Sequence, residues 1–552
     1  MAIYRAEQVK FGFTAEAGRG GTPELATASD ASSAATKSIN LAAGYAAGTK
    51  TMVVDGGSGT FVIGDYVRIG TSTAANREIR KLTKTSATSV SFDTPTGFFH
   101  ANNEVITELN PGTLGTHASI TGLAGTSFAT FIPGVYETIT TPDLTPEFLP
   151  QYFLSSTANR NWSRMYRGRQ TFTGGVPSFM LLNGTPLRFP IGKVATTGTD
   201  VGSGGGGTLN GATVRGATTI VASAATNYAA GDFIQIGTGT SAEVRQIVTI
   251  ASTTLTLNYP LMQDHATGVT LNEVTGPYTH TIVETSQLDS VTWNVSQRDS
   301  SETAANDFNR RYYGGTIGRG TLAAEEGAML RFSWDEVQFL GLLHNEATST
   351  GVTGEIPMSS RSMIQPTGHG GSIPHESASY GTATYPTNQP YYFSQGSISL
   401  FGEEFARIRT FSLDINNQLE ARYYLRDEGS ERGPNEIQEQ RREYTMTATV
   451  ALPDSAASTS TARSLWKELI LEGKYDAAMS GFDVSLVFTR GTNDTITITA
   501  PSSSAADGLE TQGAFLRGAP HVIGTDNPLQ ADLDIMFRNM SIVVVDSEGV
   551  YP

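Results

Sequence analysis

The sequence contains no cysteine, and its 552 residues include no run of about 18 apolar residues. The absence of cysteine excludes disulfide bonds, thiolate nucleophiles and cysteine-ligated zinc. Without a long apolar run, no transmembrane helix is expected. The first residues, MAIYRAEQVKFGF, lack the apolar core and cleavage site of a signal peptide, so we expect folding in a cytoplasm and no membrane association.

Charged residues are also few, and their balance is acidic. They make up 16% of the chain, and 53 acidic against 37 basic residues give a formal net charge of −16. Tight nucleic-acid binding needs basic surface, so the overall sign suits solubility or a surface that must not adhere to DNA. The chain is too long for one ordinary core and holds 59 glycines, which predicts a mainly β protein of several domains with few helices.

One passage occurs twice. VIGDYVRIGTSTAANREIRKL at 62–82 and AAGDFIQIGTGTSAEVRQI at 229–247 share a Gly-Asp pair, alternating apolar residues and a Glu-x-Arg triplet. A histidine follows each copy, at His100 and His265. Period-two apolar spacing interrupted by Gly and Pro predicts a small β-barrel or sandwich in each copy.

The tracts before the two copies have the composition of linkers. ATASDASSAATKS precedes the first copy and VGSGGGGTLNG the second. We therefore predict two inserted β modules, at 44–109 and 209–275, in a discontinuous core made of 1–43, 110–208 and 276–552. Such a core exceeds one ordinary sandwich, which leaves open a single decorated sandwich or two fused sandwiches.

Alternation also marks strands in the core. RTFSLDINNQLEARYYL predicts a hairpin that turns at Asn416-Asn417, because Asn tolerates the positive φ of tight turns. FDVSLVFTRGTNDTITITAP predicts a second hairpin. Helices are predicted at STARSLWKELILEGKYD, at SWDEVQFLGLL from its Ser333–Glu336 capping pattern, and as one turn from Pro146.

Residues suited to catalysis do not form a known motif. The loop TGHGGSIPHES contains His369 and His375 but lacks the order of a phosphate-binding loop. The pairs Glu325-Glu326 and Glu403-Glu404 are adjacent, and neighbours in a strand point to opposite faces. We predict neither an enzyme nor a bound metal or cofactor.

The segment TANRNWSRMYRGRQTFTGG is the one basic and aromatic run. It suits either a phosphate backbone or a subunit interface, and the acidic chain favours the interface. The candidate interface residues are Arg160, Trp162, Arg164, Tyr166, Arg167 and Arg169.

Taken in order, the core segments resemble phage major tail tube proteins of long non-contractile, siphophage-type tails. The likeness covers MAIYRAEQVKFGFTAEAGRGGTPE, YRGRQTFTGGVPSFMLLNGTPLRFPIGKV, LDSVTWNVSQRD and RRYYGGTIGRGTLAAEEGAMLRFSWDEV. It is strongest in the closing half, where Asn416-Asn417, Gly433-Pro434 and Glu443-Tyr444-Thr445 are the local anchors.

This resemblance implies a structural β-sandwich subunit that forms rings around a β-barrel lumen. Rings are usually hexameric, and two fused sandwiches would give a pseudo-hexameric trimer instead. The rings stack into a tube whose acidic lumen conducts the DNA genome during ejection without specific binding. Tape-measure and tail-terminator proteins are the implied partners, and the location is the virion tail, after assembly in the host cytoplasm.

Within that framework, Glu403, Glu404 and Asp414 are the candidate acidic surface or lumen residues. Two other functions stay open from the sequence. A capsid-decoration or host-adhesion protein would use the two modules to bind carbohydrate. A depolymerase would need a carboxylate site and a long β-helix repeat, and neither pattern is present in the sequence.

Overall fold

A computed structural model describes most of the chain, and the fold is almost entirely antiparallel β-sheet. The described residues are 4–16, 30–46, 48–63, 65–71, 78–92, 96, 99–109, 133–142, 147–152, 164–202, 207–299, 308–345, 389–400, 403–404, 408–424, 433–434, 436–451, 482–501, 513–522 and 530–551. Among them, no helix has the length and apolar character needed to cross a membrane.

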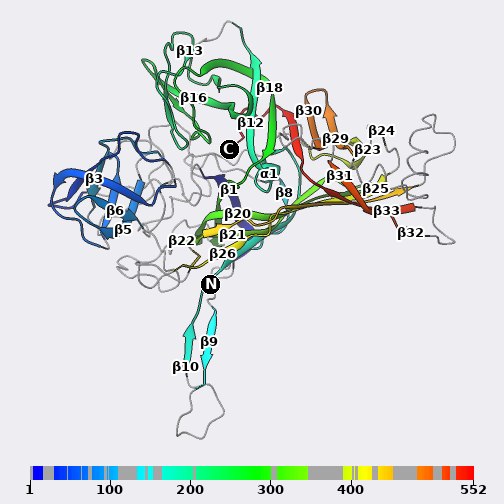
Figure 1. The fold of residues 1–552 in the computed structure, drawn as a ribbon, viewed down its shortest axis with the longest axis horizontal. Coiled ribbons are helices and arrows are strands. Elements are labelled where there is room, and N and C mark those ends of the chain that lie inside the picture. Colours follow the sequence, from blue (N-terminus) through cyan, green and yellow to red (C-terminus); the bar gives the residue numbers. More distant parts are fainter. Residues whose placement is uncertain are drawn as a thin grey trace.

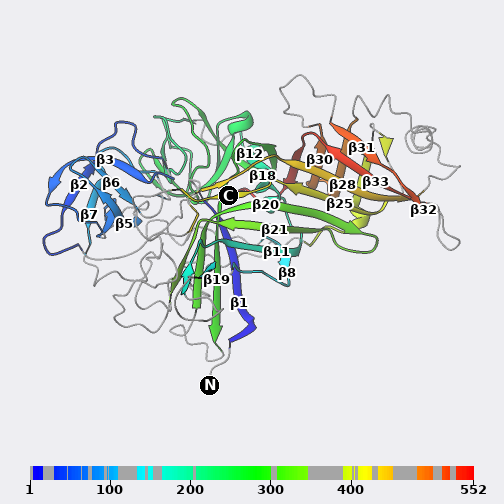
Figure 2. The same ribbon diagram turned by 60° about the horizontal axis from the view of Figure 1, so that its bottom comes forward.

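The first of two large sheets contains strands that lie side by side in Figure 2. Its order is β31 (Ala514–Gly518), β33 (Gln530–Phe537), β28 (Glu443–Ala451), β25 (Ile408–Asn416), β20 (Phe308–Glu325), β21 (Arg331–Phe339), β11 (Phe172–Met180) and β8 (Val135–Tyr136). Four more strands attach beside this path: β1 (Tyr4–Ala15), β19 (Val291–Asp299), β22 (Gly341–Asn345) and β32 (His521–Val522).

The second large sheet joins the C-terminal strands to those of the second repeated passage. Its order is β14 (Thr219–Val221), β17 (Thr254–Leu257), β16 (Glu243–Ala251), β15 (Phe233–Ile236), β18 (Thr270–Glu284), β34 (Ser541–Asp546), β30 (Asp494–Ala500), β29 (Val484–Gly491), β23 (Gly396–Leu400) and β24 (Glu403–Glu404). Strands β12 (Gly192–Asp200) and β13 (Gly207–Thr208) also pair with β18.

A single apolar core fills the space between these two sheets. It runs from Phe11 near the start of the chain to Tyr551 near its end, and it takes Leu413 from the first sheet and Leu486 from the second. Trp334 lies at its centre, with its ring centroid 5.0 Å from that of Phe13 in an edge-to-face contact. The Trp334 indole donates to the carbonyl of Pro186, in the short helix α1 (Thr185–Arg188).

The first repeated passage lies within a separate closed barrel, which Figure 1 shows at the left, apart from the sheets. Its strands are β2 (Thr36–Ile39), β3 (Thr51–Ser58), β6 (Ser89–Phe92), β5 (Glu78–Thr85), β4 (Tyr66–Ile69) and β7 (Val105–Glu108). The barrel has its own apolar core. Residues 209–275, called the second passage from here on, include the repeated stretch with the strands around it, and this region has another core around Ile234, Ile236, Leu255 and Leu257.

The Gly-Asp pairs of the two passages make the same turn. The Asp65 carboxylate accepts from the amide of Val62, and the Asp232 carboxylate accepts from that of Ala229, both at 2.6 Å. Short aspartate side chains favour such local turns. Each turn leads directly into a strand, β4 or β15, which explains why this dipeptide recurs.

Three local expectations were wrong. Residues 331–339 form strand β21 where a helix from Ser333 was predicted, and Phe148–Gln151 form strand β9 where a helical turn was predicted. The predicted hairpin at Asn416-Asn417 does not form, because β25 pairs with β20 and β28. The residues after that turn form β26 (Glu420–Arg422), which pairs with β27 (Glu436–Gln438). The helix expected at 460–476 lies outside the described residues.

Candidate functional site: a polar sheet face and a projecting hairpin

The first large sheet has one apolar face and one polar face. Inward residues such as Leu413 and Met446 are at most 1% exposed. The register aligns the outward residues in rows across the strands. One row is Ser333, Thr321, Asp414, Thr445 and Met536, and the next is Arg331, Ala323, Ser412, Thr447 and Asp534. Small hydroxyl and carboxyl side chains therefore dominate this surface.

Asp414 lies in the first of these rows. Its carboxylate accepts from Arg319 Nε at 2.8 Å and from Thr321 Oγ1 at 3.1 Å. The pKa of Arg319 is raised, chiefly by the hydrogen bond that it donates to Asp414 and then by the charge of that carboxylate. The two side chains are 49% and 27% exposed, so water screens the pair and it contributes little to stability.

Other carboxylates lie on the same face. Asp335 accepts from the hydroxyls of Thr321 and Ser333, both at 2.8 Å. Asp534 pairs with Arg517 at 2.8 Å, and Asp532 accepts from Thr449 at the same distance. Strands β20, β21, β25, β28 and β33 contain no lysine. The face is therefore polar and acidic, and its Arg319, Arg331 and Arg517 are each paired with a carboxylate or a hydroxyl.

Glu403 and Glu404 lie elsewhere. They form strand β24, where Glu404 pairs with Ser399 and Glu403 with Leu400. This strand ends the second sheet, whereas Asp414 belongs to the first. The three predicted carboxylates thus do not share a sheet, and their assignment to an acidic lumen stays a prediction.

The candidate interface run coincides with a hairpin that projects from the body in Figure 1. Strand β9 pairs with β10 (Arg164–Arg167), and Tyr166 stands opposite Leu149. Large apolar side chains are exposed on both strands and directly after β9: Phe148, Leu149, Tyr152, Met165 and Tyr166. A lone two-stranded hairpin is marginal in water, and such a patch indicates a binding surface.

The base of this hairpin is fixed to the body by Arg169. Its guanidinium lies 3.4 Å from the Glu147 carboxylate and over the ring of Tyr423, 5.9 Å from the centroid. Arg169 therefore makes contacts within the subunit. Arg164, Tyr166 and Arg167 lie in β10, and Arg160 and Trp162 lie outside the described residues.

Thr196, His280 and Asp546 lie together in the core, although no sequence motif predicted this arrangement. Thr196 Oγ1 lies 2.9 Å from His280 Nδ1, and His280 Nε2 lies 3.2 Å from Asp546. Tyr551 stacks on His280 and donates to Asp546. Both side chains of the His280–Asp546 pair are 0% exposed, so a substrate has no access to them. The arrangement fastens the end of the chain to β18 and β12.

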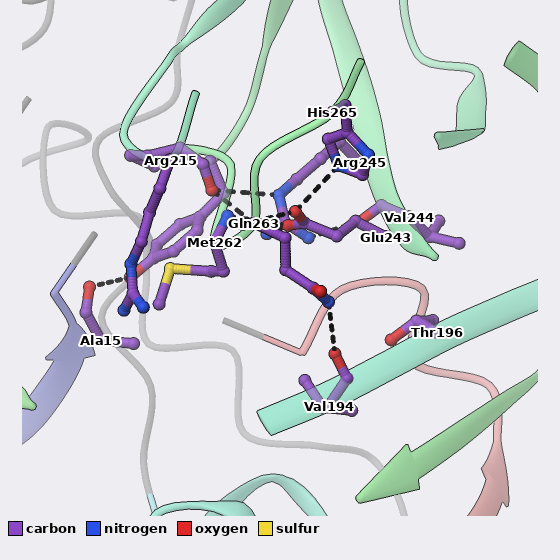
Figure 3. A network of polar contacts seen from close by, with 12 residues as sticks. Ala15, Val194, Thr196, Arg215, Glu243, Val244, Arg245, Met262, Gln263 and His265 are labelled. Carbon is purple, nitrogen blue, oxygen red and sulfur yellow. Dashed lines mark hydrogen bonds and ion pairs between the residues drawn. The ribbon is translucent and has the colours of Figure 1, made fainter. Parts of the chain in front are cut away.

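The recurring Glu-x-Arg and histidine residues form a buried polar network in the second passage (Figure 3). Glu243 accepts from Arg245 at 2.5 Å and from the amides of Met262 and Gln263, and it lies 3.1 Å from His265. Burial alone would raise the pKa of Glu243, but Arg245 and His265 outweigh it and lower that pKa. In the first passage Arg80 is likewise buried, and His100 lies 3.2 Å from Glu104.

Glu16 is a buried anchor in the fold, and it belongs to none of the candidate sites predicted from the sequence. Its buried carboxylate accepts from Ser290, Thr292 and the amide of Gly314 at 2.5–2.8 Å. It thereby joins the end of β1 to β19 and β20, across nearly 300 residues. Within the described ranges, no group of three or more acidic or histidine side chains is suited to a metal ion.

The comparisons with known proteins agree with this architecture. A family model described as phage tail tube protein matches residues 155–537, which is more than half of the chain. The chain belongs to the phage tail tube protein family. It is accordingly a structural subunit of the virion tail that assembles with its own copies into a tube. No curated protein matches the sequence.

The matched range places the tail tube fold on the chain. It includes the strands with the polar rows, from β20 to the end of β33 at Phe537, and also the second repeated passage. The closed barrel between residues 36 and 108 precedes it. The barrel thus lies outside the range that the family model matches.

Proposed function

We propose that the polar face of β20, β25, β28 and β33 lines the channel of the tail tube, through which the DNA genome passes during ejection. The observation that carries this proposal is the set of outward rows, which place Thr and Ser beside Asp414 and Asp534. Unpaired Lys or Arg would bind successive phosphates, whereas short hydroxyls and carboxylates leave DNA free to slide.

The size of such a channel favours six copies in a ring. Four strands from each of six copies would give about 24 strands, and a spacing of about 4.8 Å with a tilt of about 40° makes a wall about 48 Å across. Side chains would leave a bore of about 38 Å. Three copies would leave about 14 Å, hardly wider than the major groove of DNA alone, which is about 12 Å. The single core between the two sheets supports one sandwich per chain.

The hairpin β9–β10 then serves as the contact to the next ring. Its exposed Phe148, Leu149 and Tyr166 need burial, and a second copy of the chain supplies a surface wherever rings stack. Of the six candidate interface residues, Arg169 fixes the base of this arm and Tyr166 lies on its exposed strand.

The barrel and the second passage stand outside the tube in this proposal, since bulky modules in the bore would obstruct DNA. We also propose that the two modules are insertions in the core, at residues 44–109 and 209–275. Tape-measure and tail-terminator proteins are proposed to contact the tube, and rings are proposed to assemble in the host cytoplasm. The subunit is given no catalytic role, because its buried His280 is closed to substrate.

The absence of cysteine gives a direct test of the channel face. Thr447→Cys places a thiol in the middle of the polar rows, and Thr51→Cys places one on an exposed strand of the barrel. Free subunits should react with a bulky maleimide polymer at both positions, and assembled tubes only at Thr51→Cys. Equal labelling of Thr447→Cys in tubes would show that this face is not inside.

A further inference from the structure

A polar cavity of about 280 Å³ lies where the second passage meets the sandwich. Its walls come from helix α1, from strand β12, from the second passage and from the loop between β18 and β19. The charged and amide side chains in these walls are Arg188, Lys193, Arg215, Asp264, Gln287 and Asp289. The cavity belongs to no surface assigned above.

Asp289 holds two of the cations in this cavity. One carboxylate oxygen lies 2.6 Å from Arg188 and the other lies 2.6 Å from Arg215. Asp264 accepts from the backbone amide of Arg215 at 2.7 Å. Both carboxylates of the wall therefore already have donors.

Two cationic groups of the cavity have N–H donors without an acceptor among the described residues. Arg188 is fully buried, and its Nε–H has no hydrogen-bond partner among the described residues. An unsatisfied buried donor is costly, so a native protein normally supplies an acceptor. Lys193, half-buried on β12, has no ion pair or side-chain hydrogen bond within the described part of the chain.

The charges of the wall do not cancel. Arg188, Lys193 and Arg215 face Asp264 and Asp289, and the adjacent Glu243–Arg245 pair is internally neutral. Burial lowers the pKa of Arg188, Asp289 opposes that effect, and Arg215 and Arg245 lower it further. The cavity thus carries an excess positive charge of one, together with two free donors.

We propose that this cavity binds a singly charged oxyanion, which accepts from Arg188 Nε and from the Lys193 ammonium. Dihydrogen phosphate and a carboxylate share this chemistry, and the cavity has room for either with water, at about 30 Å³ per water. The carboxylate has two sources: a free ion or an acidic side chain of a neighbouring copy. Its role is to fasten the second passage to the sandwich, since the donors come from the sandwich and Arg215 from the passage.

Thermal unfolding of the full-length subunit tests the site. The Tm is measured in phosphate at pH 6 or in acetate, and each is compared with the Tm in chloride at the same pH and ionic strength. Binding predicts a saturable rise in Tm, about 1 °C at ten times the dissociation constant. Lys193→Met should abolish the rise. Lys37→Met, which removes a half-buried strand lysine of the barrel, should keep it.

Assembly distinguishes the two sources. If a neighbouring copy supplies the carboxylate, Lys193→Met should reduce tube formation several-fold, and acetate should compete with assembly of the unaltered chain. If a free ion is bound, Lys193→Met should assemble normally and lose only the rise in Tm. The proposal is overturned if neither anion changes the Tm and Lys193→Met assembles and melts like Lys37→Met. Because tube formation by the unaltered chain is scored separately, failure here is independent of the proposed channel.

Discussion

Asp414 on β25 accepts a hydrogen bond from Arg319 on β20 at 2.8 Å, one residue away from Leu413, which is wholly buried in the core. The two faces of strand β25 therefore have different roles. The inward residue stabilises the sandwich, and the outward pair sits on a surface that the fold itself does not need. This separation is what makes the polar face available for a channel.

The first prediction follows from that separation. Leu413→Ala should lower the free energy of unfolding by about 2–5 kcal/mol, because it leaves a cavity between the sheets. Asp414→Ala should cost at most about 1 kcal/mol, because the ion pair is partly exposed. Denaturant unfolding of both variants measures the difference, and a large loss for Asp414→Ala would contradict the assignment of a merely solvated pair.

Charge reversal on the polar face should slow the passage of the DNA genome through the tube. Asp532 is exposed on β33, and its carboxylate accepts from the Thr449 hydroxyl in the described structure, so Asp532→Lys adds a cation to the proposed bore. Tubes should still assemble, while DNA release from triggered virions slows severalfold at low salt and recovers at high salt. Asp55→Lys, on an exposed strand of the barrel, is the matched control.

Unchanged release kinetics in Asp532→Lys virions would argue against this face as the channel wall. Equal slowing by Asp532→Lys and Asp55→Lys would show a general effect of charge and would also count against it.

The projecting hairpin should matter for assembly and not for folding. Tyr166→Ala removes an exposed ring from β10, and Tyr424→Ala removes a comparably exposed ring elsewhere, at 45% and 52% exposure. Both variants should keep the circular dichroism and Tm of the unaltered chain. Negative-stain microscopy should show short or absent tubes for Tyr166→Ala and normal tubes for Tyr424→Ala. Normal tubes in both would remove the hairpin from the inter-ring contact.

The buried Glu243 network predicts how stability depends on acid. The pKa of Glu243 is lowered in the folded chain from its ordinary value of 4.5, so its stabilising effect is present above that value and is lost as the pH falls through the folded pKa. Glu243→Gln should unfold more easily at pH 7, by about 3–5 kcal/mol, because Arg245 loses its buried partner.

Tm measured between pH 3 and pH 7 tests this reasoning. The curve of Glu243→Gln should be flatter below pH 4.5 than that of the unaltered chain. Parallel curves for the two proteins would mean that protonation of Glu243 does not cause the loss of stability in acid.

Alternation was the most informative feature of the sequence. It predicted the buried faces of residues 411–415 and 482–488 correctly, because a strand packed on one side must place an apolar residue at every second position. The likeness to tail tube proteins is confirmed by the matched family model. The division into a core and two modules stays a prediction, although Asp65 and Asp232 make the same turn.

Features that depend on distant partners could not be predicted. The capping pattern at Ser333 is weak compared with the pairing of β21 to β20 and β11, which buries Trp334. Glu16 finds its three donors 274 or more residues away, and nothing near it in the chain marks them. The cavity beside Arg188 likewise collects residues from four separate segments.

Cryo-electron microscopy of assembled tubes tests the central claim most directly. The account predicts rings of six copies, with Asp414 and Thr447 facing the axis and the closed barrel on the outer surface. A tube whose bore is lined by the barrel, by the second passage or by the other sheet would contradict it.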